Sequence, residues 1–379
     1  MLASFLPYSF LLLGVMVLGT LTGLSSSCWL GAWVGLEINL IGFIPILVYG
    51  GSMKEGESGI LYFIVQSLGS GLLMVGSLIS FDVAGGWDVS LYEVYPWSLV
   101  VTSMSLMLKL GSFPFHSWFP KVMAGGSWFS CLLLVTWQKV GPLFLLNEMI
   151  WSWSNCESST FGLSGPKIFL FLLIVGSLGS LIGGVGGINQ TEVRALLAYS
   201  SIGHIGWMVF CCLLGWGVLL NYFVFYFFIS VCFFVALWRF EGYSHLRMSV
   251  GKSEESKFSE TSVILMLLSL GGMPPLLGFY PKLVVILECC WGYGPVYLSM
   301  LILGSLISLY YYLSLLFSVS LHSFLRFGLE GGDSWGDKTL VKKSFLSKSF
   351  NFAFMGPIFA VNSMGCIALV FTPLLGMVL

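Results

Sequence analysis

The sequence predicts an all-α polytopic membrane protein with about eleven transmembrane helices, and three observations support this fold class. Hydrophobic residues make up 57% of the chain and charged residues only 9%, whereas soluble domains carry about 25% charged residues. The mean hydropathy is +0.94, so lipid must be the solvent for most of the chain. Apolar runs of about 20 residues, the length that crosses ~30 Å of hydrocarbon, recur from end to end.

Each run must form a helix, because lipid offers no partner to an exposed backbone N–H or C=O. The predicted spans, in chain order, are 4–23, 28–49, 59–80, 97–123, 127–150, 167–185, 193–214, 218–239, 259–288, 295–320 and 352–377. Two of them, 97–123 and 259–288, are too long for one straight span and carry Gly and Pro at their centres, so we expect both helices to be broken. The span 127–150 has an ordinary length, and we expect one unbroken helix there.

The loops are short except at 240–258 and 321–351, so the chain is expected to be a single membrane domain over 1–379. Basic residues predict its orientation, because twelve of them fall in one alternating set of loops and only Lys167 falls in the other. By the positive-inside rule, we expect the N-terminus and both long loops on the negative side of the membrane. The C-terminus is then expected on the positive side.

The two long spans contain one motif used twice. GSFPFHSWFPK (111–121) and GGMPPLLGFYPK (271–282) place two prolines and a lysine at equal spacing. Because the two spans are five places apart in chain order, the fourth and the ninth, they cross the membrane in opposite directions and the two copies form an inverted repeat. Paired broken helices in an inverted repeat point to a transport site, and a simple packing kink is the alternative. Inversion puts Lys121 at the negative-side surface, where we expect an interfacial role.

Four charged residues lie inside predicted spans: Glu37, Lys109, Lys139 and Lys282. Each costs at least ~2.5–3.5 kcal/mol by insertion scales, so a function or a pairing must justify it. Burial disfavours the charged form of a lysine and a nearby carboxylate favours it, so these lysines can change protonation with their surroundings. We predict a proton relay in which Glu37 pairs with Lys109. The alternatives are a static ion pair or, mainly for Lys282, a side chain that extends to the interface.

Other residues carry weaker signals. His204, in the middle of its span, and His116, in the first break, are candidate uncharged relay groups, with a hydrogen-bonded structural role as the alternative. The 9 cysteines show no metal-ligand spacing and are expected to be small apolar fillers. A net charge of −1 gives no basic surface for nucleic acid. No dinucleotide, iron–sulfur or haem motif is evident, so we expect no cofactor and no metal in this chain.

Several segments between residues 33 and 283 share a likeness to one family. They are WVGLEINLIGFIPIL (33–47), YFIVQSLGSGLL (62–73), MLKLGSFPFHSWFPKV (107–122), TWQKVGPL (136–143), GGINQTEVRALLAYSSIGHIGWM (186–208) and GGMPPLLGFYPKL (271–283). In order and spacing they resemble the subunit 2 family of mitochondrial NADH dehydrogenase, the antiporter-like subunits of complex I. That family is also similar to Mrp-type cation/proton antiporters.

The resemblance implies roles for the charged residues. Glu37 matches the family's channel glutamate, Lys139 its central lysine, and Lys109 and Lys282 the lysines of its two broken helices. It also implies an antiporter-like core over 28–320, followed by a loop at 321–351 and a last helix at 352–377 with no assigned function.

The same resemblance implies a setting and partners. The chain would be the proton-translocating subunit of NADH:ubiquinone reductase, a translocase of the mitochondrial inner membrane with its N-terminus in the matrix. Its partners would be other membrane-arm and accessory subunits and lipids, and NADH, FMN, iron–sulfur clusters and ubiquinone would bind in other subunits. A stand-alone cation/proton antiporter and a purely structural membrane subunit are the rival interpretations. An antiporter should be stable when purified alone, whereas a complex I subunit should be obtained only with its partners, so purification distinguishes the two.

Overall fold

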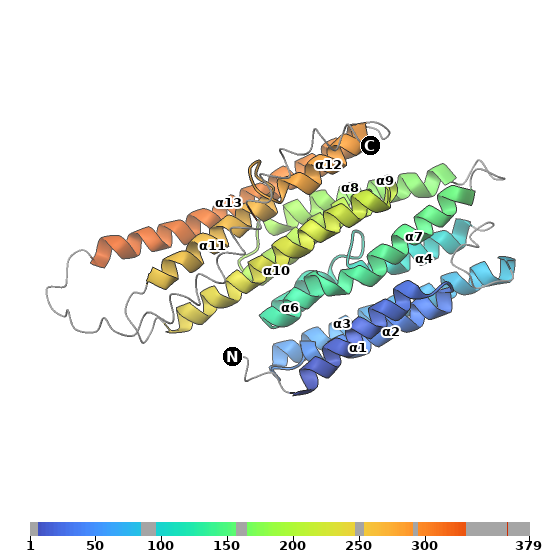
Figure 1. Ribbon diagram of the computed structural model, residues 1–379, viewed down its shortest axis with the longest axis horizontal. Helices are drawn as coiled ribbons and strands as arrows, with labels where there is room; N and C mark the ends of the chain where they lie inside the picture. Colours follow the sequence, from blue (N-terminus) through green and yellow to red (C-terminus); the bar gives the residue numbers. More distant parts are fainter. Residues whose placement is uncertain are drawn as a thin grey trace. The chain divides into compact units, whose positions relative to one another are not determined.

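The computed structural model describes residues 7–84, 96–156, 165–246, 254–290 and 295–330 and the single residue Asn362. The elements in these ranges are all helices (Figure 1). The all-α fold class is therefore confirmed. The chain divides into two compact units, namely Met1–Asn221 with Val285–Ser305, and Tyr222–Val284 with Leu306–Leu379.

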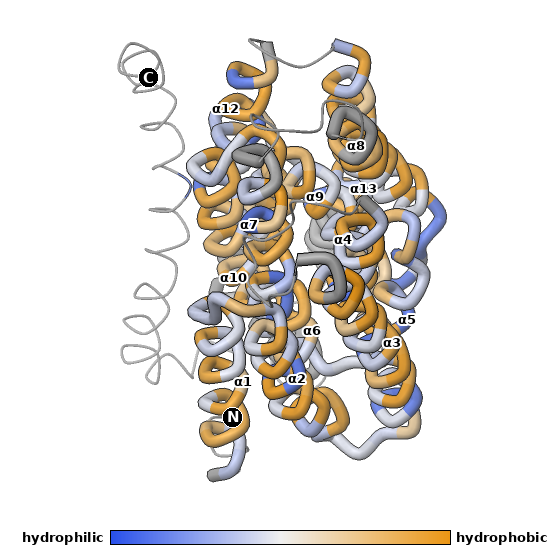
Figure 2. The backbone as a smooth tube through the Cα atoms, turned by 90° about the vertical axis from the view of Figure 1, so that its right-hand side faces the viewer, coloured by the Kyte–Doolittle hydropathy of each residue, from blue (hydrophilic) through white to orange (hydrophobic). Residues whose placement is uncertain are grey.

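The first unit contains nine α-helices. They are α1 (Pro7–Ser25), α2 (Trp29–Leu47), α3 (Met53–Ala84), α4 (Pro96–Leu110), α5 (Trp118–Gly125), α6 (Trp128–Val135), α7 (Val140–Cys156), α8 (Gly165–Gly187) and α9 (Val193–Leu214). α1 packs on α2, α3 packs on α2 and α4, and α8 packs on α9 (Figure 1). Apolar residues run along most of α1, α2 and α3 instead of forming one stripe (Figure 2), which is the pattern of helices in lipid.

Glycines bring α8 and α9 close together. A Cβ on Gly206 of α9 would lie 2.6 Å from the Gly176 carbonyl oxygen, and one on Gly183 of α8 would lie 2.5 Å from the Gly203 nitrogen. Only residues without a side chain allow this approach, and small residues at such contacts are typical of helices packed in membranes.

The second unit is built from α10 (Trp216–Leu246), α11 (Glu254–Gly271), α12 (Phe279–Cys290) and α13 (Pro295–Glu330), although parts of α10, α12 and α13 belong to the first. Aromatic side chains fill its interior. The rings of Phe225 and Tyr280 are 4.9 Å apart between centroids, and those of Tyr311 and Tyr312 are 4.6 Å apart. Such edge-on and tilted pairs stabilise an interior beyond the area they bury.

Both long spans are broken, as the sequence predicts. α4 ends at Leu110 and α5 begins at Trp118, and α11 ends at Gly271 and α12 begins at Phe279. Gly111 follows α4 with φ +70° and Gly272 follows α11 with φ +79°. This left-handed conformation is open to glycine at little cost and ends the helix.

The prediction of one unbroken helix over 127–150 is wrong. α6 stops at Val135, a short 3-10 turn η2 (Trp137–Lys139) follows, and α7 begins at Val140. Two local causes are visible. The Thr136 hydroxyl donates to the Leu132 carbonyl at 2.7 Å, beside the Thr136 N–H that donates to the same oxygen at 3.0 Å, and such back-bonding bends and weakens a helix. Pro142 has no N–H for the carbonyl four residues before it, that of Gln138.

The predicted spans from 4–23 to 295–320 coincide with helices or with interrupted helices. Within the described residues, eight segments are long and apolar enough to cross a membrane, and the shorter Trp97–Leu110 and Thr261–Gly271 are the first halves of the two broken helices. The span 352–377 lies outside the described residues except for Asn362, so the number eleven stays a prediction. α10 and α13 continue to Leu246 and Glu330, into the predicted loops 240–258 and 321–351, because a helix can outlast the apolar stretch that lipid requires.

Candidate functional site

Lys109 lies in the last turn of α4, directly before the first break, and only 6% of it is exposed. α3 prepares its place in two ways. Gly69 leaves room for the lysine stem, because a Cβ there would lie 2.9 Å from Lys109 Cγ. Gln66 donates from Nε2 to the Lys109 carbonyl at 3.3 Å, a carbonyl that the helix end leaves without a helical partner.

Glu37 lies on α2 and is partly buried. Its carboxylate acts electrostatically on Lys109 and on the buried Tyr62. Within the described contacts, no direct ion pair joins Glu37 to Lys109. The two are therefore electrostatic neighbours rather than a closed salt bridge.

Lys139 is the last residue of the η2 turn and is only 1% exposed. Its Nζ lies over the ring of Phe119, 5.7 Å from the ring centroid, which is within the range of a cation–π contact. Phe119 belongs to α5, the second half of the first broken helix. The break therefore places Lys109 on one half and the ring beside Lys139 on the other.

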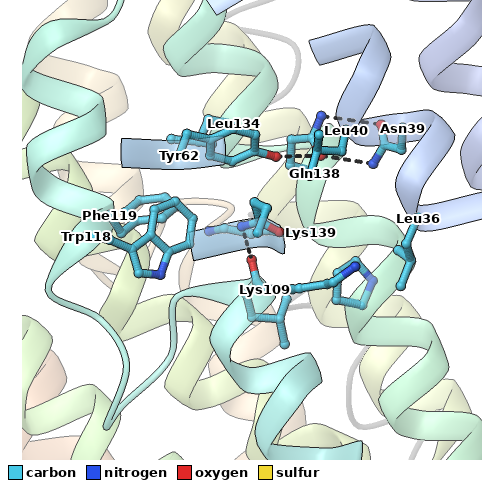
Figure 3. A pocket seen from close by; sticks show the side chains of 13 residues that line it. Leu36, Asn39, Leu40, Tyr62, Lys109, Trp118, Phe119, Leu134, Gln138 and Lys139 are labelled. Carbon is cyan, nitrogen blue, oxygen red and sulfur yellow. Dashed lines mark hydrogen bonds between the residues drawn. The ribbon is translucent and has the colours of Figure 1, made fainter. Parts of the chain in front are cut away.

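Lys109 and Lys139 line the same cavity, shown in Figure 3. Its polar lining comes from Asn39, Tyr62, Gln66, Lys109, Gln138 and Lys139. Apolar side chains, Leu36, Leu40, Leu110, Trp118, Phe119, Leu134 and Pro142, close the rest. The space is about 20 Å³, enough for about one water molecule among several polar partners.

A cluster of neutral hydrogen bonds forms one wall of this cavity. Asn39 Nδ2 donates to Gln138 Oε1 at 2.9 Å, and Gln138 Nε2 donates back to Asn39 Oδ1 at 3.3 Å. The Tyr62 hydroxyl donates to the same Gln138 oxygen at 3.3 Å. Figure 3 shows Tyr62 and Asn39 joined to Gln138 by these bonds. The cluster ties α2 and α3 to the turn that carries Lys139.

Lys282 belongs to the second unit. It lies on α12, is 7% exposed, and donates from Nζ to the Gly271 carbonyl at 3.1 Å. That carbonyl is the last of α11, so the ammonium lies at the negative end of a helix dipole. Gly272 allows this approach, because a Cβ there would lie 2.9 Å from Lys282 Nζ.

The two histidines do not line the cavity. His204 lies in the middle of α9 and is partly buried. His116 lies in the first break, and its Nδ1 is buried without a hydrogen-bond partner among the described residues. In the same part of the chain, no group of three or more His, Cys, Asp or Glu side chains could hold a metal ion.

The structure brings together two of the predicted site residues, Lys109 and Lys139, with Glu37 close by. Sequence reasoning missed the residues that hold them: Asn39, Tyr62, Gln66, Phe119 and Gln138. One signal was available for three of these, because an amide inside an apolar span needs a hydrogen-bond partner. The aromatic residues had no such signal, since Phe and Tyr are common throughout the spans.

The chain is similar to relatives from several animals. It is 35% identical over 319 residues to the protein named NADH-ubiquinone oxidoreductase chain 2 of Lumbricus terrestris, covering 82% of this chain and 87% of the relative. It is 34% identical over 351 residues to the protein of the same name from Anopheles gambiae, covering 92% of this chain and 95% of the relative.

Solved structures share the fold. A chain of respiratory complex I from Thermus thermophilus superposes with a TM-score of 0.73 at 21% identity, over 96% of this chain and 79% of that one. A chain of the Mrp complex from Dietzia superposes with a TM-score of 0.69 at 17% identity, over 80% of this chain and 58% of that one. At these identities the likeness is one of fold.

The family model described as NADH:quinone oxidoreductase/Mrp antiporter, transmembrane, matches residues 26–308. The match includes both broken helices and all four charged residues named above. Together with the identity to the animal relatives over more than four fifths of its length, this establishes the family. The chain is a multi-pass membrane protein that belongs to the NADH-ubiquinone oxidoreductase chain 2 group of the NADH:quinone oxidoreductase/Mrp antiporter family.

Proposed function

We propose that this chain is a proton-translocating core subunit of respiratory complex I in the mitochondrial inner membrane. Electron transfer from NADH to ubiquinone takes place in other subunits, which hold the FMN, the iron–sulfur clusters and the quinone. This chain binds no cofactor and moves protons by changes in the charge of Glu37, Lys109, Lys139 and Lys282. Its partners are the other membrane-arm and accessory subunits and the surrounding lipids.

One observation carries the proposal: two lysines, 6% and 1% exposed, line one cavity with room for water. A permanently charged lysine in a membrane span is costly. A cavity water and a carboxylate nearby allow each amine to take up and release a proton without the chain unfolding. Family membership supports this function, because the relatives are named as chains of NADH-ubiquinone oxidoreductase.

The proposed path begins at Glu37 and Lys109. A proton passes from there through the cavity to Lys139, and then through His204 or water to Lys282. Lys282 is the group nearer the positive-side exit, because it follows the break of a helix that enters from the negative side. Each step transfers only a proton, so this path requires no redox centre.

Replacing Lys139 by methionine tests the proposal. Lys139→Met removes the buried charge for an apolar side chain of similar length, so the assembled complex should form in normal amounts. Coupled NADH oxidation and proton pumping should fall together, by about tenfold or more, as expected when a proton-transfer group is lost. Lys139→Arg should not restore them, because a guanidinium stays protonated.

The matched control is Lys54→Met, at an exposed position near the start of α3. It should leave both rates unchanged. If the assembled Lys139→Met enzyme pumps protons at the normal rate, Lys139 is not part of a relay and has only a structural role.

The family also contains Mrp-type antiporters, so a stand-alone cation/proton antiporter is the second candidate. A Na⁺ site needs several oxygen ligands. The lining of this cavity holds two lysine amines, whose charge repels a cation, beside neutral amide and hydroxyl groups and no carboxylate. Purification separates the two candidates. A chain that is stable alone and exchanges Na⁺ or K⁺ for protons in vesicles would favour the antiporter.

A further inference from the structure

Lys139 is carried by a turn that has lost part of its backbone support. The η2 turn interrupts the helix, and Pro142 supplies no N–H to the Gln138 carbonyl. The first turn of α7, which directly follows η2, lies against α2, since a Cβ on Gly141 would come within 2.8 Å of Leu36 Cδ2. Side chains must therefore fix the position of this turn.

The amide pair supplies that support. Asn39 and Gln138 donate to each other at 2.9 and 3.3 Å, and Asn39 is only 3% exposed. Tyr62, 2% exposed, adds a third bond at 3.3 Å to the Gln138 oxygen. That oxygen thus accepts two hydrogen bonds, which is the usual capacity of an amide carbonyl. Asn39 lies two residues after Glu37, and Gln138 lies next to Lys139.

We propose that Asn39 and Gln138 form an amide latch that positions Lys139 relative to the Glu37 helix, with Tyr62 as its third member. The latch residues are positioning residues and carry no proton themselves. This inference rests on the relay proposed above, because it assigns the residues that set the distance over which the proton must pass.

The neutrality of the latch matters for its action. Amides keep the same hydrogen bonds whether Lys139 is charged or neutral, so the turn holds its position through a full cycle. An ionised side chain at either place would attract or repel the lysines and change with them. Because the latch is made of amides, Lys139 stays in the same position whether its amine is charged or neutral.

The test removes the latch and leaves every relay group in place. Asn39→Leu and Gln138→Met are close in shape to the residues they replace and delete the amide bonds from different helices. In the assembled enzyme, each is expected to lower coupled proton pumping about tenfold, because proton transfer depends steeply on position. Coupled NADH oxidation should fall together with pumping while the amount of assembled enzyme stays normal, an outcome that a loss of stability alone does not cause.

The matched control is Asn147→Leu, which removes another buried amide, 3% exposed, from α7 but outside the cavity lining. It should keep normal rates of coupled NADH oxidation and proton pumping. Exchanging the latch residues, Asn39→Gln with Gln138→Asn, keeps the combined length and the reciprocal bonds. This double variant should recover much of the activity that either single apolar variant loses.

The latch is overturned if both apolar variants pump as Asn147→Leu does, or if the exchanged pair recovers nothing. A failure of the relay gives a different result. The relay is refuted if the assembled Lys139→Met enzyme pumps normally. The latch alone is refuted if the Lys139→Met enzyme does not pump while both latch variants pump at the normal rate. If one variant fails to assemble, the other reports from a different helix.

Discussion

At the scale of single residues, the place of Lys109 is prepared by α3. Gly69 makes room for its stem and Gln66 binds its carbonyl. The charged residues could be found from the sequence because a lysine or glutamate in an apolar span is rare and costly. The supporting residues could not be found in the same way. The chain is rich in glycine, and the sequence does not indicate which glycine faces a lysine. A glutamine side chain can form hydrogen bonds with many different neighbours, so its partner cannot be predicted either.

Glu37 and Lys109 provide a residue-scale prediction. They influence each other electrostatically without a direct ion pair. Changing one, as in Glu37→Gln or Lys109→Met, leaves a charge in the membrane without its counterpart. We expect each single variant to reduce the assembled complex more than the double variant does, with a coupling of about 1 kcal/mol.

A double-mutant cycle on the amount of assembled enzyme measures this coupling. Additive losses, with the double variant as poor as the sum of the two, would show that Glu37 and Lys109 act independently. The exposed residues Lys54 and Glu57 on α3 give a control cycle, because water screens charges at the surface.

At the scale of elements, three membrane spans are interrupted within the described residues, and the sequence predicts two of these interruptions. The breaks after α4 and α11 are marked by glycine and proline together. The interruption at η2 is caused by a threonine back-bond and a proline in the first turn of α7, each of which many regular helices tolerate.

Gly111 supplies the prediction at this scale. Alanine there would need a left-handed backbone at φ +70° and would press on Phe119 and Trp118, at 3.0 and 3.2 Å. Gly111→Ala should cost roughly 1–2 kcal/mol and disturb the ring beside Lys139, lowering both the heat stability of the assembled enzyme and its pumping. Gly71→Ala, in open space on the regular helix α3, is the control and should change neither. Equal behaviour of the two would show that the break does not depend on Gly111.

At the scale of the whole molecule, lipid decides most of the fold. Helices form wherever the sequence is apolar for long enough, so the positions of the spans from 4–23 to 295–320 were predictable from hydropathy, although the interruption within 127–150 was not. The side of the membrane is a separate matter, carried by the basic residues. Twelve basic residues against one predict that 240–258 and 321–351 face the matrix.

Accessibility labelling checks this orientation. Single cysteines introduced by Ser256→Cys and Ser334→Cys should react with an impermeant thiol reagent only when the matrix side is open. Ser90→Cys, in the predicted loop of the other set, should react from the intermembrane side of intact mitochondria. The reverse pattern would invert the topology and with it the proposed direction of proton flow.

The two broken helices end on different chemistry. Neutral donors, Trp118 Nε1 at 3.2 Å from the Leu108 oxygen and Gln66 at the Lys109 oxygen, hold the end of α4. The end of α11 is held at Gly271 by the amine of Lys282. In the relay proposed above, Lys282 carries a proton. Thermodynamic linkage is mutual, so a change in the charge of Lys282 would then change how firmly the end of α11 is held, and a force that moves this helix end would change the proton affinity of Lys282. The two copies of the motif are therefore unlike. Neutral donors hold the helix end in the first copy, and under the proposed relay the second would be a joint through which mechanical work and proton affinity are exchanged.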